Sequence, residues 1–280
     1  MSKQICFHRH HIKTGLFFKA CKASKRLTIE EHMNIKGKRI LVTGGGVRIG
    51  RSIATTLAQA GADIVIHYRS SSDAAEELAE TLRISGARAD TVCGDLATEK
   101  GTASIMEQAL HHGPLDGLVN NAAVFNRTPL ATSDRAAFLA EFGPNLFGPL
   151  ELIRAFAAQP HLEKHPGTIV NLLDRRIAAH DAGAVPYHLS KIALAEATRL
   201  AALEFAPRIR VNGVAPGAIL PPPEIDDPDY LTQHGGNAPL THRCTPEDIA
   251  SAVLFFFTQP ALTGQILFVD AGQHLLGNGV

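Results

Sequence analysis

The alternation of short apolar runs with longer stretches of helical periodicity, from Gly37 onward, limits the fold more than any other feature of this sequence. Apolar runs separated by helices form repeated βαβ units, whose strands lie parallel in one sheet. The apolar runs predict strands at 39–43, 63–68, 89–93, 117–120, 168–172, 210–214 and 266–269. The periodic stretches predict helices at 49–60, 73–85, 100–111, 134–159, 187–205 and 246–258. Since no internal repeat and no Gly- or Ser-rich linker divides the chain, we expect one α/β domain over 35–280.

A glycine-rich turn, TGGGVRIG at residues 43–50, connects the first predicted strand to the first predicted helix. Glycines let the backbone approach a pyrophosphate, and the helix that follows offers free N–H groups and the positive end of its dipole. With a strand before it and a helix after it, such a turn is typical of a dinucleotide site. The alternative is a tight turn that binds no ligand.

The second predicted strand ends in HYRSSS, residues 67–72, where an NAD site usually carries an acidic residue for the ribose hydroxyls. Arg69, Ser70 and Ser71 instead offer a cation and hydroxyl donors, which suit the 2′-phosphate of NADP. NADP is therefore the expected cofactor, unless Arg69 is only a solvated loop charge. Asp95, just past the third strand, is placed either to accept a hydrogen bond from the adenine amino group or to cap the next helix.

Composition narrows the range of partners. The 280 residues include 45% hydrophobic residues and 24 glycines, which suits a globular enzyme with many tight turns. The longest apolar runs, such as 252–257, are far too short to span a bilayer. Residues 1–26 hold seven of the 27 basic side chains, so the remaining 20 face 27 acidic ones, and a net charge of minus seven argues against nucleic-acid binding. The four cysteines have no metal-like spacing, which predicts no metal site and free thiols in a reducing, cytoplasmic compartment: Cys6, Cys21, Cys93 and Cys244.

The basic segment at the start of the chain has no Asp or Glu over residues 1–26 and also carries His8, His10 and His11. A targeting peptide, a nucleic-acid arm and a metal-binding tract are the functional alternatives. The segment lacks the long apolar core of a secretion signal, and Met33 directly precedes the first strand region. We therefore expect residues 1–34 to be a disordered extension or to lie upstream of the true translation start.

Tyr187 and Lys191 are four residues apart in one predicted helix, so their side chains lie on the same face. A Lys191 ammonium beside the Tyr187 phenol would favour the ionised form and lower the phenol pKa from its ordinary value of about 10. The pair is therefore a candidate for proton transfer near neutral pH.

These motifs resemble those of the short-chain dehydrogenases/reductases in order and spacing: the turn at 43–50, NNAA at 120–123, Asn145, YHLSK at 187–191 and APG at 215–217. The resemblance covers about residues 36–275. It implies a single-domain Rossmann fold, doubly wound, with seven parallel strands in the order 3-2-1-4-5-6-7. It also implies that Tyr187 is the general acid or base, that Lys191 binds the nicotinamide ribose and lowers the Tyr187 pKa, and that Asn145 supports a proton-relay water. Because related reductases are often tetramers built on helices corresponding to 134–159 and 187–205, a homotetramer is expected.

The resemblance also implies a set of cofactor-binding residues. These are Gly44, Arg48, Ile49, Gly50, His67, Tyr68, Arg69, Ser70, Asp95, Leu96, Asn121, Ala122, Lys191, Pro216 and Gly217. The segment 218–243, which begins with a run of prolines after APG, should form the lid over the substrate.

Two departures from the usual pattern narrow the resemblance. Arg48 replaces the middle glycine of the TGxxxGxG signature, and Asp174 stands 13 residues before Tyr187, where the family usually has Ser. Both changes resemble the pteridine reductase branch, including the bacterial dihydromonapterin reductases. Phe125 is placed like the aromatic residue that stacks a pterin against the nicotinamide. Ala123 departs from that branch, which commonly has Ser there. The implied substrate-binding residues are Arg48, Phe125, Asp174 and Tyr187.

A carboxyl group at position 174 changes the chemistry, since it accepts hydrogen bonds from amino or ring N–H groups and relays a proton to a ring nitrogen. This fits reduction of a C=N bond. Each residue also has a purely structural alternative. Asp174 would cap a turn or pair with Arg175, Arg176 or Arg48, Arg48 would be a surface charge, and Phe125 would be a core aromatic.

These observations predict an NADPH-dependent reductase that transfers hydride to the C=N bond of a small pterin-type substrate. One alternative is a carbonyl or 3-oxoacyl reductase, against which the replacement of Ser by Asp174 argues. The other is a cofactor-sensing protein without turnover, which usually lacks the Tyr or the Lys that this chain retains.

Overall fold

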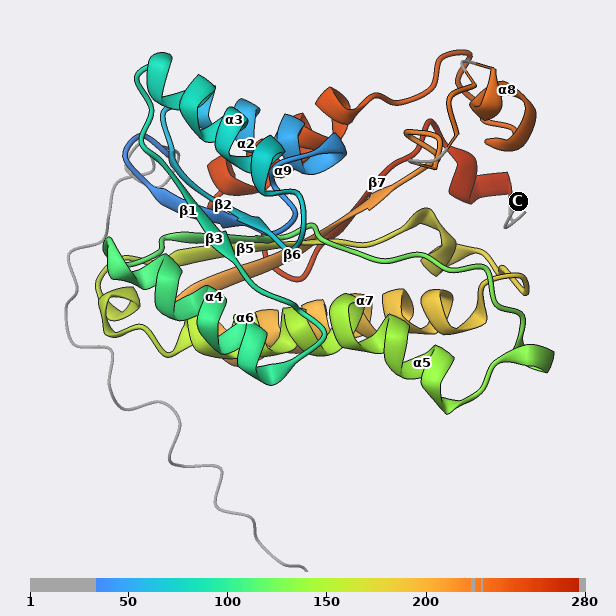
Figure 1. The fold of residues 1–280 in the computed structure, drawn as a ribbon, viewed down its shortest axis with the longest axis horizontal. Coiled ribbons are helices and arrows are strands. Elements are labelled where there is room, and N and C mark those ends of the chain that lie inside the picture. The colour runs from blue at the N-terminus through green and yellow to red at the C-terminus, as the bar shows by residue number, and fades with distance from the viewer. Residues whose placement is uncertain (1–33, 223–224, 228, 277–280) are drawn as a thin grey trace, which may run out of the picture.

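The computed structural model describes residues 34–222, 225–227 and 229–276. In this part of the chain, seven parallel strands form one sheet in the order β3-β2-β1-β4-β5-β6-β7 (Figure 1). The strands are β1 (Arg39–Val42), β2 (Asp63–Tyr68), β3 (Ala89–Cys93), β4 (Gly117–Asn120), β5 (Gly167–Leu172), β6 (Ile209–Pro216) and β7 (Ile266–Val269). The doubly wound sheet predicted from the sequence is thereby confirmed. The largest difference is at β6, which extends beyond residues 210–214 at both ends.

Helices cover both faces of the sheet (Figure 1). One face carries α2 (Arg48–Gln59), α3 (Ser72–Ile84) and α9 (Pro246–Thr258). The other carries α4 (Glu99–His111), α5 (Arg135–Phe142), α6 (Gly148–Ala157) and α7 (Val185–Phe205). The shorter helices are α8 (Tyr230–His234) and the 3-10 turns η1 (Leu130–Thr132), η3 (Pro160–Glu163), η4 (Arg175–Ala178) and η5 (Gln273–Leu276).

Side-chain alternation along the strands divides the core into two layers. Ile40 and Val42 of β1 pack in the layer beneath α2 and α9, whereas Leu41 between them packs in the layer on the opposite face. All three side chains are fully buried, and burial of each stabilises the fold by roughly 1.5–3 kcal/mol. The strand ends that carry the candidate site are therefore held from both faces.

The prediction of one continuous α-helix over 134–159 is wrong. α5 passes into a π-helical turn, η2 (Gly143–Phe147), before α6 begins at Gly148. Pro144 has no N–H to donate, which disturbs the regular hydrogen-bond ladder at this point. Asn145 lies inside the π-helical turn and is fully buried. Such turns are frequent at functional sites, because they redirect the side chains of a helix.

Some predictions fall partly or wholly outside the described residues. Of the predicted extension at 1–34, only Asn34 is described. The predicted lid is described at 218–222, 225–227 and 229–243, and it contains α8. Cys93 and Cys244 are free thiols, as predicted, while the other two cysteines lie outside the described residues. Among the helices that the structure describes, none is long and apolar enough to cross a membrane.

Candidate active site

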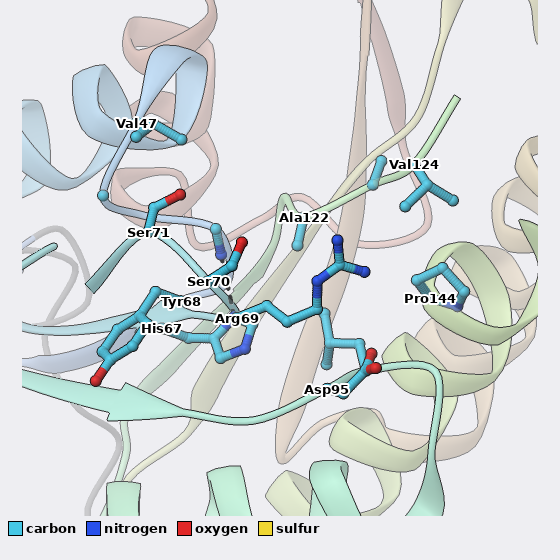
Figure 2. A pocket seen from close by; sticks show the side chains of 14 residues that line it. Val47, His67, Tyr68, Arg69, Ser70, Ser71, Asp95, Ala122, Val124 and Pro144 are labelled. Carbon is cyan, nitrogen blue, oxygen red and sulfur yellow. Dashed lines mark hydrogen bonds between the residues drawn. The ribbon is translucent and has the colours of Figure 1, made fainter. Parts of the chain in front are cut away.

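A pocket of about 170 Å³ lies where the loops after β1, β2, β3 and β4 meet (Figure 2). β1 pairs with both β2 and β4, and the chain leaves β1 and β4 toward opposite faces of the sheet, which opens a crevice at this edge. Eight predicted cofactor-binding residues line the pocket: Gly44, His67, Tyr68, Arg69, Ser70, Asp95, Leu96 and Ala122. The other lining residues are Gly46, Val47, Ser71, Ala123, Val124 and Pro144. Gly46, Val47, Ser71 and Ala123 lie in segments that the sequence had marked, whereas Val124 and Pro144 offer only backbone or apolar surface and were not marked.

Close backbone contacts shape the glycine-rich turn. Gly44 has a φ of +61°, in the left-handed region that favours glycine. A Cβ on Gly50 would lie 2.0 Å from the carbonyl oxygen of Gly44, so only glycine lets α2 begin this close to the strand. Val47, the N-cap of α2, makes no side-chain capping bond. The first N–H groups of α2 therefore have no side-chain acceptor at the cap position, as a phosphate-binding helix requires.

His67 holds the glycine-rich turn in place through hydrogen bonds of its ring. Its ring is buried, its Nδ1 accepts a hydrogen bond from the Gly44 N–H at 3.2 Å, and its Nε2 donates to the Gly94 carbonyl at 3.0 Å. Burial lowers the pKa of His67, although the bond to Gly94 and the nearby Asp95 oppose the shift. A neutral ring with a proton on Nε2 satisfies both contacts. His67 thus fixes the position of Gly44 as well as lining the pocket.

The charged and hydroxyl side chains predicted to select NADP surround the same pocket. Arg69, Ser70 and Ser71 come from the loop after β2 and line the pocket together with Asp95 from the loop after β3; Figure 2 shows Ser71 toward Val47 and Arg69 on the side of Asp95. Asp95 does not cap α4, because Thr98 does so by accepting from the Gly101 N–H at 3.0 Å. Instead, Oδ1 of Asp95 accepts from the Ala97 N–H at 2.9 Å and holds the loop at the pocket wall.

The remaining predicted cofactor residues do not line this pocket: Arg48, Ile49, Gly50, Asn121, Lys191, Pro216 and Gly217. Asn121 shapes the turn instead, since its Nδ2 donates to the Thr43 carbonyl at 2.8 Å. Ile49 packs against the core. Pro216 ends β6, and Gly217 follows it at the start of the lid segment.

Arg48 lies against the lid rather than in the pocket. Its φ of +53° is unusual for a residue with a side chain, and its Nη2 donates to the carbonyl of Pro221 at 2.6 Å. Arg48 thus joins the glycine-rich turn to the start of the lid. The prediction that it contacts the pyrophosphate and the substrate remains a proposal.

Tyr187, Asp174 and Arg176 form a connected group at the end of β5. The Tyr187 hydroxyl donates to Oδ2 of Asp174 at 2.9 Å, and Nη1 of Arg176 approaches the same oxygen at 3.1 Å. Oδ1 of Asp174 accepts from the Arg176 N–H at 2.8 Å and so caps η4. The cap and the pairing with Arg176, which were the structural alternatives for Asp174, thus coexist with its contact to Tyr187. Asp181, which is buried, holds the far side of Arg176 through an ion pair of 2.9 Å.

Lys191 does not lower the pKa of Tyr187 in the way predicted. Burial raises the pKa of Tyr187 well above 10, and the charge and hydrogen bond of Asp174 raise it further, with Arg176 acting in the opposite direction. The Lys191 ammonium lies 5.8 Å from the centre of the Tyr187 ring and donates to the Leu172 carbonyl at 2.9 Å. The prediction fails because burial disfavours the charged phenolate, and because the hydrogen bond that Tyr187 donates to Asp174 stabilises the neutral phenol.

Burial changes Lys191 itself. Its side chain is buried at the amino-terminal end of α7, and burial lowers its pKa from 10.5 to about 8, against the opposing charges of Asp174 and Glu141. A buried ammonium requires such partners to remain charged at neutral pH. The ionised state of Lys191 therefore depends on both carboxylates.

Phe125 is not a core aromatic. Its side chain is 43% exposed, and its ring meets the Tyr187 ring edge to face at a centroid distance of 4.7 Å. The guanidinium of Arg176 lies 5.3 Å from the centre of the Phe125 ring. An exposed aromatic surface is thus placed directly beside the Tyr187 and Asp174 pair.

Asn145 is locked in place by hydrogen bonds from three elements. Its side chain exchanges bonds of 2.9 Å with both backbone groups of Val124, and its Nδ2 also donates to Glu141 at 2.8 Å. Ser190, beside Lys191 on α7, is fully buried and lies 3.4 Å from the same Nδ2. The sequence pointed to Asn145 but not to Glu141, which belongs to no recognisable motif, and Ser190 was given no role although it lies within YHLSK.

Three features lie at the carboxyl ends of the strands: a glycine-rich turn between a strand and a helix, a pocket lined by Arg69, and the Tyr187 and Lys191 pair of α7. Residues 46–274 match the family model described as enoyl-(acyl carrier protein) reductase. The chain belongs to the short-chain dehydrogenase/reductase family. Within it, an uncharacterized oxidoreductase of Mycobacterium tuberculosis is 38% identical over 256 residues, covering 87% of this chain and 95% of that protein.

Two solved structures of short-chain reductases bear on the substrate. FolM alternative dihydrofolate reductase 1 from Brucella canis, complexed with NADP, is 33% identical with a TM-score of 0.76, covering 86% of this chain and 96% of that one. The angucycline C-6 ketoreductase LanV, with bound NADP, is 28% identical with a TM-score of 0.78, covering 86% of this chain and 97% of that one. The two names describe reduction of different bonds, so the comparisons define the family and leave the substrate to the chemistry of the site.

Proposed function

We propose that this short-chain reductase uses NADPH to reduce the C=N bond of a pterin-type substrate. The observation that carries the proposal is the hydrogen bond between Tyr187 and Asp174, which lies beside the exposed ring of Phe125. The similarity to a FolM alternative dihydrofolate reductase supports the same substrate class.

The residues of the pocket fit NADP. Gly50 lets α2 begin close to the glycine-rich turn, because a Cβ there would lie 2.0 Å from the Gly44 carbonyl oxygen, and α2 has no side-chain cap to compete with a phosphate. Arg69, Ser70 and Ser71 line the pocket and supply the cation and hydroxyl groups that a 2′-phosphate requires. Lys191 would bind the nicotinamide ribose. When bound, NADPH supplies the hydride for the reaction.

Tyr187 is suited to donate the proton. The raised pKa of Tyr187 keeps its hydroxyl protonated at neutral pH, which is the state a reduction needs. After the proton moves from the hydroxyl oxygen to the substrate nitrogen, the phenolate lies near Arg176, whose positive charge stabilises it. Asp174 orients the hydroxyl before transfer.

Asp174 also favours a nitrogen heterocycle over a ketone. The carboxyl oxygens of Asp174 accept hydrogen bonds from Arg176 and Tyr187, whereas the serine hydroxyl usual at this position can donate one to a carbonyl oxygen. It can accept from the amino or ring N–H groups that a pterin presents. Phe125 provides an exposed ring on which a flat substrate can stack.

A homotetramer and a cytoplasmic location complete the proposal. The side chains of α7 that face away from the core include exposed Leu189, Ile192, Leu200 and Leu203, which is consistent with helix pairing between subunits. Light scattering on the purified protein tests this, and a monomer at micromolar concentration would contradict it.

Initial rates of NADPH oxidation test the substrate. Dihydromonapterin, dihydrobiopterin and dihydrofolate are compared with a panel of ketones that includes 3-oxoacyl thioesters. Turnover of a pterin at a kcat/KM well above that of every ketone supports the proposal. Turnover of ketones alone supports the carbonyl reductase alternative, for which the similarity to LanV is the specific observation. Tight NADPH binding without any turnover supports the cofactor-sensing alternative.

A Tyr187→Phe variant tests the proton donor. General acid catalysis contributes about 10²–10⁴-fold, so kcat should fall by that factor while NADPH affinity stays close to that of the wild type. Full activity in the variant would remove Tyr187 from the mechanism.

A further inference from the structure

Glu141 is a buried acid that the proposed mechanism leaves without a role. It lies on α5 with only 2% of its surface exposed. Its Oε1 accepts hydrogen bonds from the backbone N–H and the side-chain Nδ2 of Asn126, both at 2.8 Å, and its Oε2 accepts from Nδ2 of Asn145 at 2.8 Å. Three N–H donors around one carboxyl group favour the ionised form.

The two hydrogen-bond partners of Glu141 belong to different parts of the site. Asn126 directly follows Phe125 in the loop after β4, so its bonds fix the loop that carries the exposed aromatic ring. Asn145 lies in the π-helical turn η2 and connects through Val124 to the same loop. A single carboxylate therefore ties the substrate-side loop to the helix that carries Asn145.

Glu141 is also one of the charges that face Lys191. The acidic groups acting on the Lys191 ammonium are Asp174 at the start of η4 and Glu141 on α5. The Lys191 ammonium donates a hydrogen bond to the uncharged Leu172 carbonyl of β5. Tyr187, on the same helix as Lys191, is a neutral phenol. Asp174 is already paired with Arg176, whereas Glu141 forms no ion pair within 4.0 Å among the described residues. Glu141 is connected to α7 through Asn145, whose Nδ2 lies 3.4 Å from Ser190, the residue beside Lys191.

We propose that Glu141 is a positioning residue of the active site, whose buried carboxylate orders the Phe125–Asn126 loop and Asn145 and supplies the counter-charge that keeps Lys191 an ammonium. Burial raises the pKa of Glu141, while its bonds to Asn126 and Asn145 and the charge of Lys191 oppose the shift, in agreement with this pairing. The proposal rests on NADPH-dependent reduction and not on the identity of the substrate.

The test compares Glu141→Gln with wild type, because glutamine keeps the size of the side chain and one acceptor oxygen but removes the charge. NADPH affinity is measured by nicotinamide fluorescence between pH 6 and 9.5, a readout that needs no substrate. We expect the pH at which affinity is half lost to fall by on the order of one unit, because loss of a nearby anion favours the neutral amine. Glu107→Gln on the exposed face of α4 is the matched control and should leave the midpoint unchanged.

A double variant separates electrostatics from structure. In a Lys191→Met background the alkaline midpoint should be absent, and adding Glu141→Gln should change the pH profile no further. An unchanged midpoint in Glu141→Gln, or an equal shift with and without Lys191, would overturn the counter-charge role even if activity fell.

Asn126→Ala tests whether Glu141 positions the Phe125–Asn126 loop. It also provides an independent test if Glu141→Gln does not fold. This variant keeps the charge but removes one side-chain donor that anchors the loop. We expect a severalfold rise in KM for the substrate that wild type turns over, with the alkaline midpoint of NADPH binding unchanged. An unaltered KM would overturn the positioning of the Phe125 loop through Glu141.

Discussion

The Tyr187 hydroxyl donates a hydrogen bond of 2.9 Å to Oδ2 of Asp174, and together with burial this contact raises the pKa of Tyr187. A phenol beside a lysine alone would ionise more readily, whereas a buried phenol that donates to a carboxylate stays neutral. The contact therefore favours proton donation by Tyr187, and hence reduction, at neutral pH. It also places an acceptor for N–H groups where the family usually has a serine hydroxyl.

Replacement of Asp174 by Ser should therefore exchange one substrate class for another. We expect the kcat/KM for a pterin to fall by about 10²-fold or more, because an acceptor for the substrate N–H groups and the orientation of Tyr187 are both lost. Ketone reduction should appear or increase. Steady-state kinetics on both substrate panels measures this, with Asp73→Ser on the exposed first turn of α3 as the control. Equal pterin kinetics in wild type and Asp174→Ser would contradict the assigned role.

The pH dependence should follow the Lys191 amine. Its pKa is lowered by burial to about 8, so the ammonium that would bind the nicotinamide ribose is present below that pH and lost above it. NADPH affinity of the cofactor-free protein should decline with a midpoint near pH 8 and should lack this midpoint in Lys191→Met. Isothermal titration calorimetry across pH 6.5–9.5 measures it. A flat profile in the wild type would exclude Lys191 from cofactor binding.

Lys191 should also affect stability, with a defined sign. The unfolded chain holds this proton up to about pH 10.5, whereas the folded protein releases it near pH 8. Between these values the unfolded state binds more protons, so the contribution of Lys191 to the free energy of unfolding rises with pH. Below pH 8 both states are charged and the contribution is constant. Comparing the pH dependence of denaturant unfolding in wild type and Lys191→Met isolates this contribution.

Arg69→Ala should reduce the preference for NADPH over NADH. A hydrogen-bonded charge pair with the 2′-phosphate contributes about 1.5–3 kcal/mol, which corresponds to roughly 10–100-fold in Kd. The Kd for NADPH should rise by that factor while the Kd for NADH changes little. Arg199→Ala, whose guanidinium pairs with Glu196 on the exposed face of α7, is the control. Parallel weakening of both cofactors by Arg69→Ala would argue that Arg69 does not read the phosphate.

Gly50→Ala should disrupt the cofactor turn. The added Cβ would lie 2.0 Å from the Gly44 carbonyl oxygen, so α2 or the turn must move. Overpacking of this kind costs about 1–3 kcal/mol of stability, and the displaced turn should lose most of its NADPH affinity. Thermal melts and cofactor titration measure the two effects. Arg51→Ala, the next residue and an exposed ion-pair partner of Glu77, should change stability by less than about 1 kcal/mol.

Much of the fold followed from local pattern. The alternation of apolar and periodic stretches predicted all seven strands near their observed bounds, because parallel strands buried on both faces leave a distinct apolar run. The helix at 134–159 was predicted as regular because its apolar period continues across Pro144. The π-helical turn there depends on a missing N–H and on packing against other elements, which periodicity does not record.

Some residues of the candidate site could likewise be identified from the sequence, whereas others could not. Motif spacing identified Tyr187, Lys191, Asn145 and Asp174, and the structure brings Asp174 into contact with Tyr187. Asn145 lies one helical turn after Glu141, but Asn126 meets Glu141 only when the loop after β4 folds onto α5, so the sequence did not mark Glu141. Arg48 was predicted from its place in the glycine-rich turn, but its observed contact is with Pro221, which is 173 residues away in the chain.

The sequence by itself determined the order of strands and helices, the glycine turn that opens α2, and the reactive side chains that one family shares. These features depend on local periodicity and on the types of residue at fixed spacing. Only the tertiary structure decided that the pKa of Tyr187 rises, that Lys191 is buried within the electrostatic influence of Asp174 and Glu141, and that the Phe125 ring stays exposed beside Tyr187. Burial and long-range electrostatics cause these effects, and both depend on which distant segments the fold brings together.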